Sequence, residues 1–139
     1  MLSVHQVIYE RSGGAVGHRL LFGLPSLLLR TTGRKTGLRR THGLIYVQDG
    51  DDLLVVASNN GDPAAPGWLA NIRACPECEF QIGRTVHTAV ATVIGPADRS
   101  YARRWELVNA RLFGLYEKRQ RAMTRRIAIV VLSSATERR

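Results

Sequence analysis

The chain has 139 residues, of which 45% are hydrophobic and 22% charged, so we expect one domain over residues 1–139 and exclude both a two-domain enzyme and a disordered chain. Its net charge of +9 calls for an anionic partner, such as nucleic acid, an acidic membrane surface or a small ligand with phosphate and carboxylates. The longest apolar run covers residues 127–132, which is too short for a membrane span, and no signal peptide precedes it, so we expect a cytoplasmic protein.

The N-terminal residues predict a short lead-in helix. Val4, Val7, Ile8 and Arg11 have the spacing of one helical face, and a serine and two glycines follow them. We therefore expect a helical lead-in over residues 1–24, a barrel with helices over 25–134 and a tail over 135–139.

The middle of the chain predicts two hairpins after a first strand at Ser26–Thr32. Residues 41–48 and 53–58 flank the sequence DGDD and predict a hairpin that turns at the Asp49-Gly50 pair. A helix is expected at residues 65–74, and residues 79–82 and 86–94 predict a second hairpin around Gly83 and Arg84.

The last third predicts a long amphipathic helix and a buried strand. The apolar positions of the helix recur at intervals of three and four: Tyr101, Trp105, Val108, Leu112 and Leu115. Residues 127–132 then supply the last strand. About six antiparallel strands that leave no exposed edge favour an α+β fold, a small split β-barrel with flanking helices.

The sequence CPEC invites comparison with redox motifs, but its context argues against one. In a thioredoxin-type motif a helix begins at the cysteines, whereas here the predicted helix ends before Cys75 and a strand follows Cys78. A zinc site would need two more ligands, and the four histidines lack ligand spacing. We interpret the segment as a turn with reduced thiols and expect no metal site.

Residues 32–40, TGRKTGLRR, form the most informative segment. Two glycines allow close approach of a ligand to the backbone, Thr36 offers a hydroxyl, and four cations surround them. The segment is not a Walker loop, because it lacks the four-residue spacer and precedes a strand. It suits an anion-binding loop, although a solvated basic hairpin loop would look the same.

Further segments stand in a fixed order around this loop: SGGAVGHRL before it, PSLLLRTTGRKTGLRR through it, and then DGDDLLVVASNNGDPAAPGWLANI and RRIAIVVL after it. Together they make the chain resemble the deazaflavin-dependent nitroreductase family almost from end to end. This family consists of small split-barrel proteins that use coenzyme F420.

The resemblance implies a site for coenzyme F420, an 8-hydroxy-5-deazaflavin. Its phosphate and acidic tail would bind the loop through Arg34, Lys35, Thr36, Gly37 and Arg40. Its ring would lie against Ala57, Ser58, Asn59, Trp68 and Asn71. Backbone amides at the strand end can hydrogen-bond the ring carbonyls. Tyr116 is the candidate catalytic residue that faces the substrate.

Each of these positions also has an ordinary structural interpretation. Residues 58–61 could be a polar turn, Trp68 could anchor its helix in the core, and Tyr116 could belong to the apolar stripe. Some positions depart from the family pattern: Asn59 and Asn60 replace a lysine and a glycine, and Tyr116 stands in place of a cluster of late tyrosines. These departures argue against reduction of nitro drugs.

We expect an oxidoreductase that transfers hydride from reduced F420 to a quinone, an enone or another electron-poor small molecule. The sequence offers no nucleophile–base pair, which suits chemistry supplied by a cofactor. The alternatives are an FMN-binding split-barrel reductase and a non-enzymatic binder of the cofactor or of a hydrophobic ligand. Specific nucleic-acid binding is not expected, because only 6% of the residues are aromatic. Peripheral membrane contact and a homodimer stay open.

Overall fold

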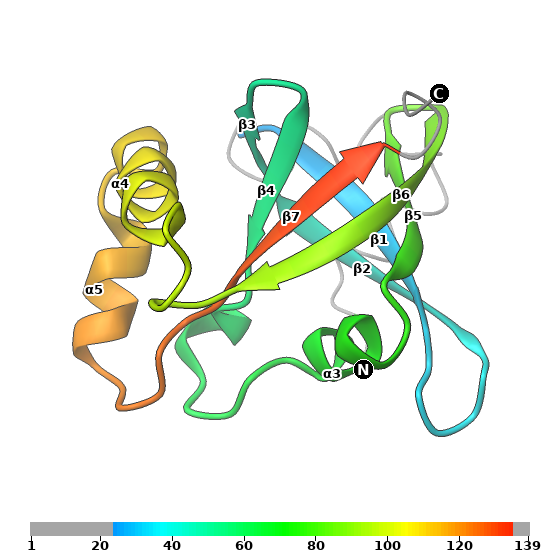
Figure 1. Ribbon diagram of the computed structural model, residues 1–139, viewed down its shortest axis with the longest axis horizontal. Helices are drawn as coiled ribbons and strands as arrows, with labels where there is room; N and C mark the ends of the chain where they lie inside the picture. Colours follow the sequence, from blue (N-terminus) through cyan, green and yellow to red (C-terminus); the bar gives the residue numbers. More distant parts are fainter. Residues whose placement is uncertain (1–23, 135–139) are drawn as a thin grey trace.

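The computed structural model describes residues 24–134, which form a curled antiparallel sheet of seven strands in the order β2-β1-β5-β6-β7-β4-β3 (Figure 1). The expected α+β split-barrel architecture is confirmed. The strands are β1 (Ser26–Thr32), β2 (Arg39–Ile45), β3 (Val47–Asp49), β4 (Asp52–Val56), β5 (Glu77–Ile82), β6 (Thr85–Ile94) and β7 (Ile129–Ser134). The predicted lead-in helix lies outside the described residues.

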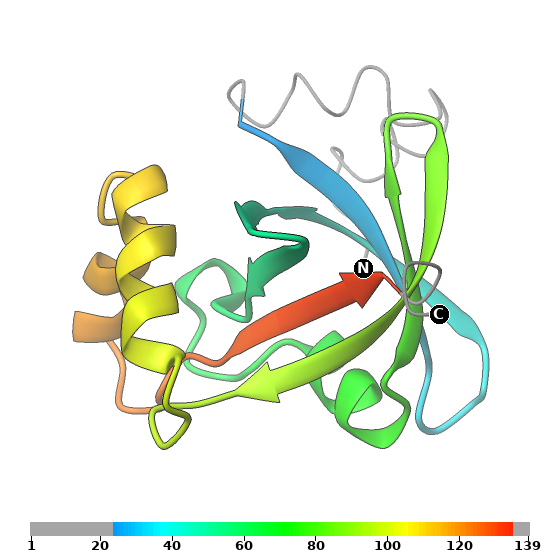
Figure 2. The ribbon, with the colours of Figure 1, turned by 45° about the horizontal axis from the view of Figure 1, so that its top comes forward.

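Helices cover both faces of the sheet. They are α3 (Gly67–Ala74), α4 (Tyr101–Arg111) and α5 (Leu115–Arg121), with a single turn, η1 (Asn59–Gly61), after β4. Figures 1 and 2 show α4 and α5 together beside β7 and β4, whereas α3 lies at the end of the barrel near the β1–β2 loop.

The sheet separates two apolar cores, and β7 contributes to both. Val130 and Leu132 pack into the inner core with α3, whereas Ile129 and Val131 pack into the outer core under α4 and α5. Because successive side chains of a strand point to opposite faces, a strand that is covered on both sides is apolar at every position. This explains the uninterrupted apolar run in the last strand.

The predicted strand at residues 41–48 is two strands in the structure. It breaks at Tyr46, whose backbone N–H donates to the carbonyl of Pro25 at 3.1 Å instead of joining a ladder. On one side of the break β2 pairs with β1, and on the other β3 pairs with β4. The same continuous stretch of chain therefore supplies both outermost strands of the sheet, which is why seven strands replace the six expected.

Two other predictions of local structure were wrong in detail. The first hairpin turns at Gly50 and Asp51, because Asp49 pairs with Asp52 across the turn. The long amphipathic helix is interrupted at Phe113 and Gly114, whose φ angles of 57° and 74° are left-handed and cannot continue a right-handed helix. The expected turn at Gly83 and Arg84 is confirmed, because Ile82 pairs with Thr85.

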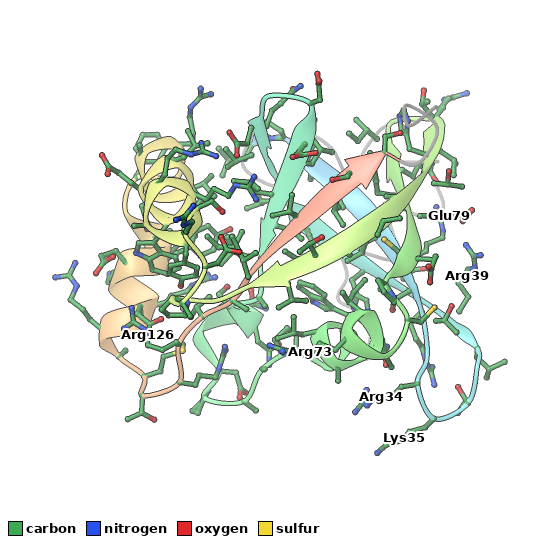
Figure 3. All side chains as sticks on the ribbon, in the orientation of Figure 1. Arg34, Lys35, Arg39, Arg73, Glu79 and Arg126 are labelled. Atoms are coloured by element: carbon green, nitrogen blue, oxygen red, sulfur yellow. The ribbon has the colours of Figure 1, made fainter. Side chains whose placement is uncertain are left out.

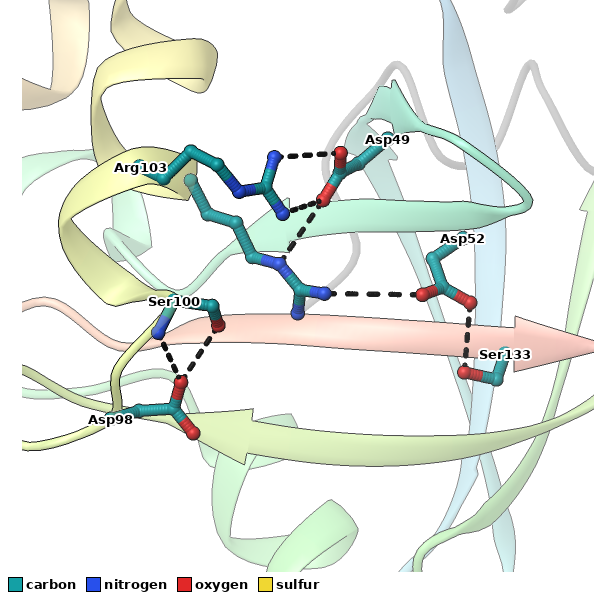
Figure 4. Close-up of polar contacts among 7 residues, drawn as sticks. Asp49, Asp52, Asp98, Ser100, Arg103 and Ser133 are labelled. Atoms are coloured by element: carbon teal, nitrogen blue, oxygen red, sulfur yellow. Dashed lines mark hydrogen bonds and ion pairs between the residues drawn. The ribbon is translucent and has the colours of Figure 1, made fainter.

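An ion-pair network fixes α4 to the β3–β4 hairpin (Figure 4). The Arg103 guanidinium donates to both carboxylate oxygens of Asp49, at 3.0 and 2.9 Å, and Arg104 Nε lies 3.1 Å from the same carboxylate. Arg104 also reaches Asp52, which accepts a hydrogen bond from Ser133 of β7. The hydrogen bond from Arg103 holds the pKa of Asp49 below its ordinary value, although burial opposes this shift.

We expect Asp49→Asn to lower the free energy of unfolding at neutral pH, because the variant loses both ion pairs. A carboxylate with a lowered pKa contributes stability above its unfolded pKa and loses it as the pH falls. The difference from the wild type should therefore shrink below about pH 3.8, the ordinary value for this group. Urea unfolding followed by circular dichroism at several pH values measures it, and a difference independent of pH would contradict the assignment.

Candidate functional site

The cationic segment is the loop that joins β1 to β2, and it is closed by its own backbone. Gly33 N–H donates to the Leu38 carbonyl at 2.7 Å, and Gly37 N–H donates to the Gly33 carbonyl at 2.8 Å. Gly37 has a φ of +72°, which favours glycine, and a Cβ on Gly33 would lie only 3.0 Å from the Leu38 oxygen. Both glycines of the motif are thus required by the backbone of the loop.

Asn71 of α3 holds this loop against the barrel. Its side-chain oxygen accepts hydrogen bonds from the Arg34 backbone N–H at 3.1 Å and from the Arg34 guanidinium at 2.9 Å. The guanidinium also donates to the Gly67 carbonyl, and the Asn71 amide donates to Thr31 at 3.4 Å. Asn71 is 5% exposed, so it supports the loop from beneath.

The loop presents positive charge that the rest of the described chain does not neutralise. Lys35 and Arg40 are exposed and have no ion pair with any of residues 24–134, whereas Arg39 pairs with Glu79 (Figure 3). The Arg40 guanidinium is turned toward the loop, with its Nε 3.7 Å from the Cβ position of Gly33. The backbone amides of Lys35 and Thr36 also lack an acceptor among these residues. Unpaired cations and free amides fit a phosphate.

The end of β4 forms the second part of the site. Ala57 and Ser58 are buried, and the chain then turns through Asn59, Asn60 and Gly61 with φ angles of 51°, 55° and 84°. The backbone amides of Ser58, Asn59 and Asn60 have no acceptor within the described part of the chain. Successive free amides at a transition from right-handed to left-handed backbone can bind anionic or carbonyl oxygens.

Two arginines that the sequence analysis did not select support this strand end. Arg119 of α5 donates to the Ser58 hydroxyl at 2.9 Å. Arg125, between α5 and β7, donates to four backbone carbonyls at 2.8 to 3.1 Å: those of Ala57, Ser58, Asp62 and Pro63. Sequence patterns carry no signal for these contacts, because each arginine lies 61 to 68 residues from the residues that it binds.

The remaining candidates lie in separate cores. Trp68 is 4% exposed and packs in the inner core beneath the loop and the strand end. Tyr116 is equally buried but packs in the outer core with α4, on the opposite face of the sheet. The structure therefore brings the loop, the strand end and α3 to one end of the barrel but does not join Tyr116 to them, and its catalytic role stays a prediction.

A shallow hollow opens beside the strand end. Its lining comes from Pro63, from Arg121 at the end of α5, and from the three residues that follow the helix: Ala122, Met123 and Thr124. Arg125 donates to the carbonyl of Pro63, which lines the hollow, and to the carbonyl of Ala57 at the strand end, so one side chain connects the two.

Cys75 and Cys78 have free thiols, but the segment is not the simple turn predicted, because β5 begins at Glu77 and Cys78 pairs with Ala89 in the sheet. Burial raises the pKa of the Cys78 thiol to about 11, so this thiol stays protonated at neutral pH. Within residues 24–134, no group of three or more histidine, cysteine or acidic side chains could hold a metal ion. None of the helices in this range is long and apolar enough to cross a membrane.

Comparison with known proteins places this arrangement in a family. Residues 1–134 match the family model described as F420H(2)-dependent quinone reductase. An F420H(2)-dependent quinone reductase of Mycobacterium tuberculosis is 42% identical over 133 residues, which cover 96% of this chain and 89% of the relative. A solved structure of an F420-H2 dependent reductase, FDR-A, is 28% identical with a TM-score of 0.69 and covers 78% of this chain and 94% of that chain. A second solved structure, described only as a domain-swapped dimer, is 25% identical with a TM-score of 0.70 and covers 94% of this chain and 100% of that chain.

Because Tyr116 is buried, we expect it to affect how the free energy of unfolding changes at alkaline pH. Burial raises the pKa of Tyr116 to about 12 from an ordinary 10.0, so the folded chain keeps a proton that the unfolded chain loses. Stability from this group is fully present below pH 10.0 and is lost as the pH rises toward 12. Tyr116→Phe should therefore lose less stability than the wild type over this range in urea titrations. Tyr46 and Tyr101 titrate in both proteins, so an equal alkaline loss would show that Tyr116 is not buried in this way.

Proposed function

Because this chain belongs to the F420H(2)-dependent quinone reductase family, we propose that it reduces quinones with hydride from reduced coenzyme F420. The observation that carries the proposal is the match over residues 1–134, which includes every part of the site. When bound, the coenzyme supplies the hydride from its deazaflavin ring, so the protein needs no nucleophile of its own. The acceptor is a small molecule.

The β1–β2 loop would hold the phosphate and acidic tail of F420. Lys35 and Arg40 supply unpaired charge, Thr36 supplies a hydroxyl and an amide, and Gly37 allows the turn that exposes them. Arg34 carries a further charge that Asn71 keeps in place. A charge pair at about 4 Å is worth about 1 kcal/mol in water and several times more near a protein surface. A partly sheltered cluster of three cations would therefore dominate the affinity for the tail.

The strand end would hold the ring. Ser58 and Asn59 offer backbone amides to its carbonyl oxygens, and Ala57 allows close approach. Trp68 and Asn71 would act from beneath, the first by packing in the inner core and the second by fixing the loop. Of the predicted site residues, Tyr116 fits this site least, because it packs in the outer core.

We further propose that the hollow lined by Pro63 and residues 121–124 receives the quinone. It adjoins the strand end, and Ala122 and Met123 give it an apolar lining that suits a quinone ring. The substrate would then approach from the side of α5 while the coenzyme tail extends toward the β1–β2 loop.

A homodimer and a peripheral membrane contact extend the proposal. The solved relative described as a domain-swapped dimer supports the first, and the excess of cations over acids in residues 99–139, eleven against three, supports the second. The cytoplasmic location and the single domain over residues 1–139 also stay predictions.

Replacing the unpaired cations should weaken coenzyme binding. We expect Lys35→Ala combined with Arg40→Ala to raise the dissociation constant of F420 at least about tenfold, because two charges near the phosphate are lost. A fluorescence titration of the coenzyme measures it. Arg39→Ala is the matched control, since Arg39 is engaged by Glu79, and it should change the affinity little. Equal effects of the two variants would remove the assignment of the loop.

A bulky side chain in the hollow should weaken binding of the quinone acceptor and leave binding of the coenzyme unchanged. Ala122→Trp places a large ring in the hollow, and we expect the KM for menadione to rise about tenfold, equivalent to about 1.4 kcal/mol, with F420 affinity unchanged. Ala102→Trp, at an exposed alanine of α4 outside the hollow, is the control. An unchanged KM would place the acceptor elsewhere.

Turnover separates this function from its alternatives. Purified protein should oxidise reduced F420 in the presence of menadione and should not copurify with yellow FMN. Binding of F420 without oxidation by any quinone or enone would favour a non-enzymatic binder.

A further inference from the structure

Arg125 organises the segment after β4 through an unusual set of contacts. Its guanidinium donates only to backbone carbonyls, namely those of Ala57, Ser58, Asp62 and Pro63. The Asp62 carboxylate accepts the Ala64 N–H at 2.8 Å instead, and no ion pair joins Arg125 to an acid among residues 24–134. A guanidinium with five donors in a rigid plane is suited to holding several oxygens at fixed positions.

These contacts determine which way the neighbouring amides point. In a trans peptide the C=O and the following N–H point in opposite directions, because the six atoms of the unit are coplanar. No peptide bond in the described chain is cis. Since Arg125 draws the Ala57 and Ser58 oxygens to its own side, the N–H groups of Ser58 and Asn59 are directed away from it. These are two of the amides that lack an acceptor in this part of the molecule.

Arg119 fixes the same segment through a side chain. Its guanidinium donates to the Ser58 hydroxyl, whose own proton is then available to another acceptor. The aliphatic part of Arg119 lies under the turn, 3.8 Å from the Cβ position of Gly61. The two arginines thus hold Ser58 by its carbonyl and by its hydroxyl.

The turn has an uncommon backbone that its surroundings must hold in place. Asn59 and Asn60 both have left-handed φ angles, a region that asparagine enters more readily than other non-glycine residues. The turn has hydrogen bonds of its own: Asn59 donates to the Ala64 carbonyl, Gly61 N–H donates to the Ser58 carbonyl, and Asp62 N–H donates to the Asn59 carbonyl. Without the arginines, the segment would relax toward other conformations.

We propose that Arg119 and Arg125 are positioning residues that orient the Ser58 and Asn59 amides toward the ring of the coenzyme. They act through the backbone and the Ser58 hydroxyl and need not touch the ligand. This inference rests on the proposed function for the identity of the ligand, but the orientation of the amides is a property of the protein alone and can be tested without it.

The first test is hydrogen exchange of the protein without coenzyme. Arg125→Ala should speed exchange of the hydrogen-bonded amides of this segment, those of Gly61, Asp62 and Ala64, by about tenfold, while the strands β5, β6 and β7 keep their protection, because only a local segment loses its support. Arg126→Gln is the matched control, since Arg126 is exposed and has no hydrogen bond or ion pair with the described residues (Figure 3). Unchanged exchange in residues 57–64 would overturn the proposal.

The second test measures hydride transfer in single turnovers with menadione. Arg125→Ala should slow the step by about tenfold to a hundredfold, because a displacement of about 1 Å in a reacting group has effects of this order. Arg119→Gln should act in the same direction and more weakly. Millimolar guanidinium should restore part of the rate of Arg125→Ala, whereas methylammonium at equal ionic strength should not, since only the planar ion can replace the contacts to several carbonyls.

These outcomes separate the inference from the proposed function. If the wild type fails to bind F420 or to reduce quinones, the proposed function is wrong, and the exchange experiment still tests the role of the arginines in the fold. If the wild type is active but Arg125→Ala reacts at the wild-type rate, or if Arg125→Lys is as good as arginine, the positioning role is wrong. Should Arg125→Ala fail to fold, Arg119→Gln provides the same comparison.

Discussion

The contact between Asn71 and Arg34 joins the two halves of the site. A single side-chain oxygen accepts from both the backbone and the guanidinium of Arg34, and this links the β1–β2 loop to α3. The helix is itself fixed by Trp68, Leu69 and Ile72 in the inner core, which also contains the residues of β4 that lead to the strand end. Packing therefore sets the spacing between the loop and the strand end, and the site is preorganised for a ligand that spans both.

The arginines of this chain have several distinct roles, although composition counts them all as charge. Arg39 and Arg103 form ion pairs at the surface, and Arg125 binds backbone carbonyls. Lys35 and Arg40 are left without an acidic partner among residues 24–134. Composition therefore does not show which cations can meet an anionic ligand, and at the loop the structure brings two such cations together.

The sequence predicted most strands because strand patterns are local. Alternating burial, turn residues and apolar runs located β1, β6 and the hairpins to within a few residues. The breaks at Tyr46 and Phe113 were missed. The first depends on a hydrogen bond to Pro25, and at the second the apolar spacing continues past Gly114, whose left-handed φ ends the helix.

The candidate site divides in the same way. The glycines and cations of the loop were predicted from their own chemistry, and the strand end was predicted only through a family resemblance. Arg119 and Arg125 were not found, because they lie about sixty residues from the segment that they hold. The place of Tyr116 in the outer core could not be inferred either, since its helical spacing fits both a core and a pocket.

The position of β7 in the sheet has a consequence for how the protein is made. This last strand pairs with β6 on one side and β4 on the other, so it lies inside the sheet and not at an edge. A nascent chain that stops before residue 129 exposes the facing edges of β4 and β6, and both cores lack the side chains that β7 contributes. The sheet can therefore close only after residues 129–134 have been synthesised, and until then its two open edges are exposed to edge-to-edge association.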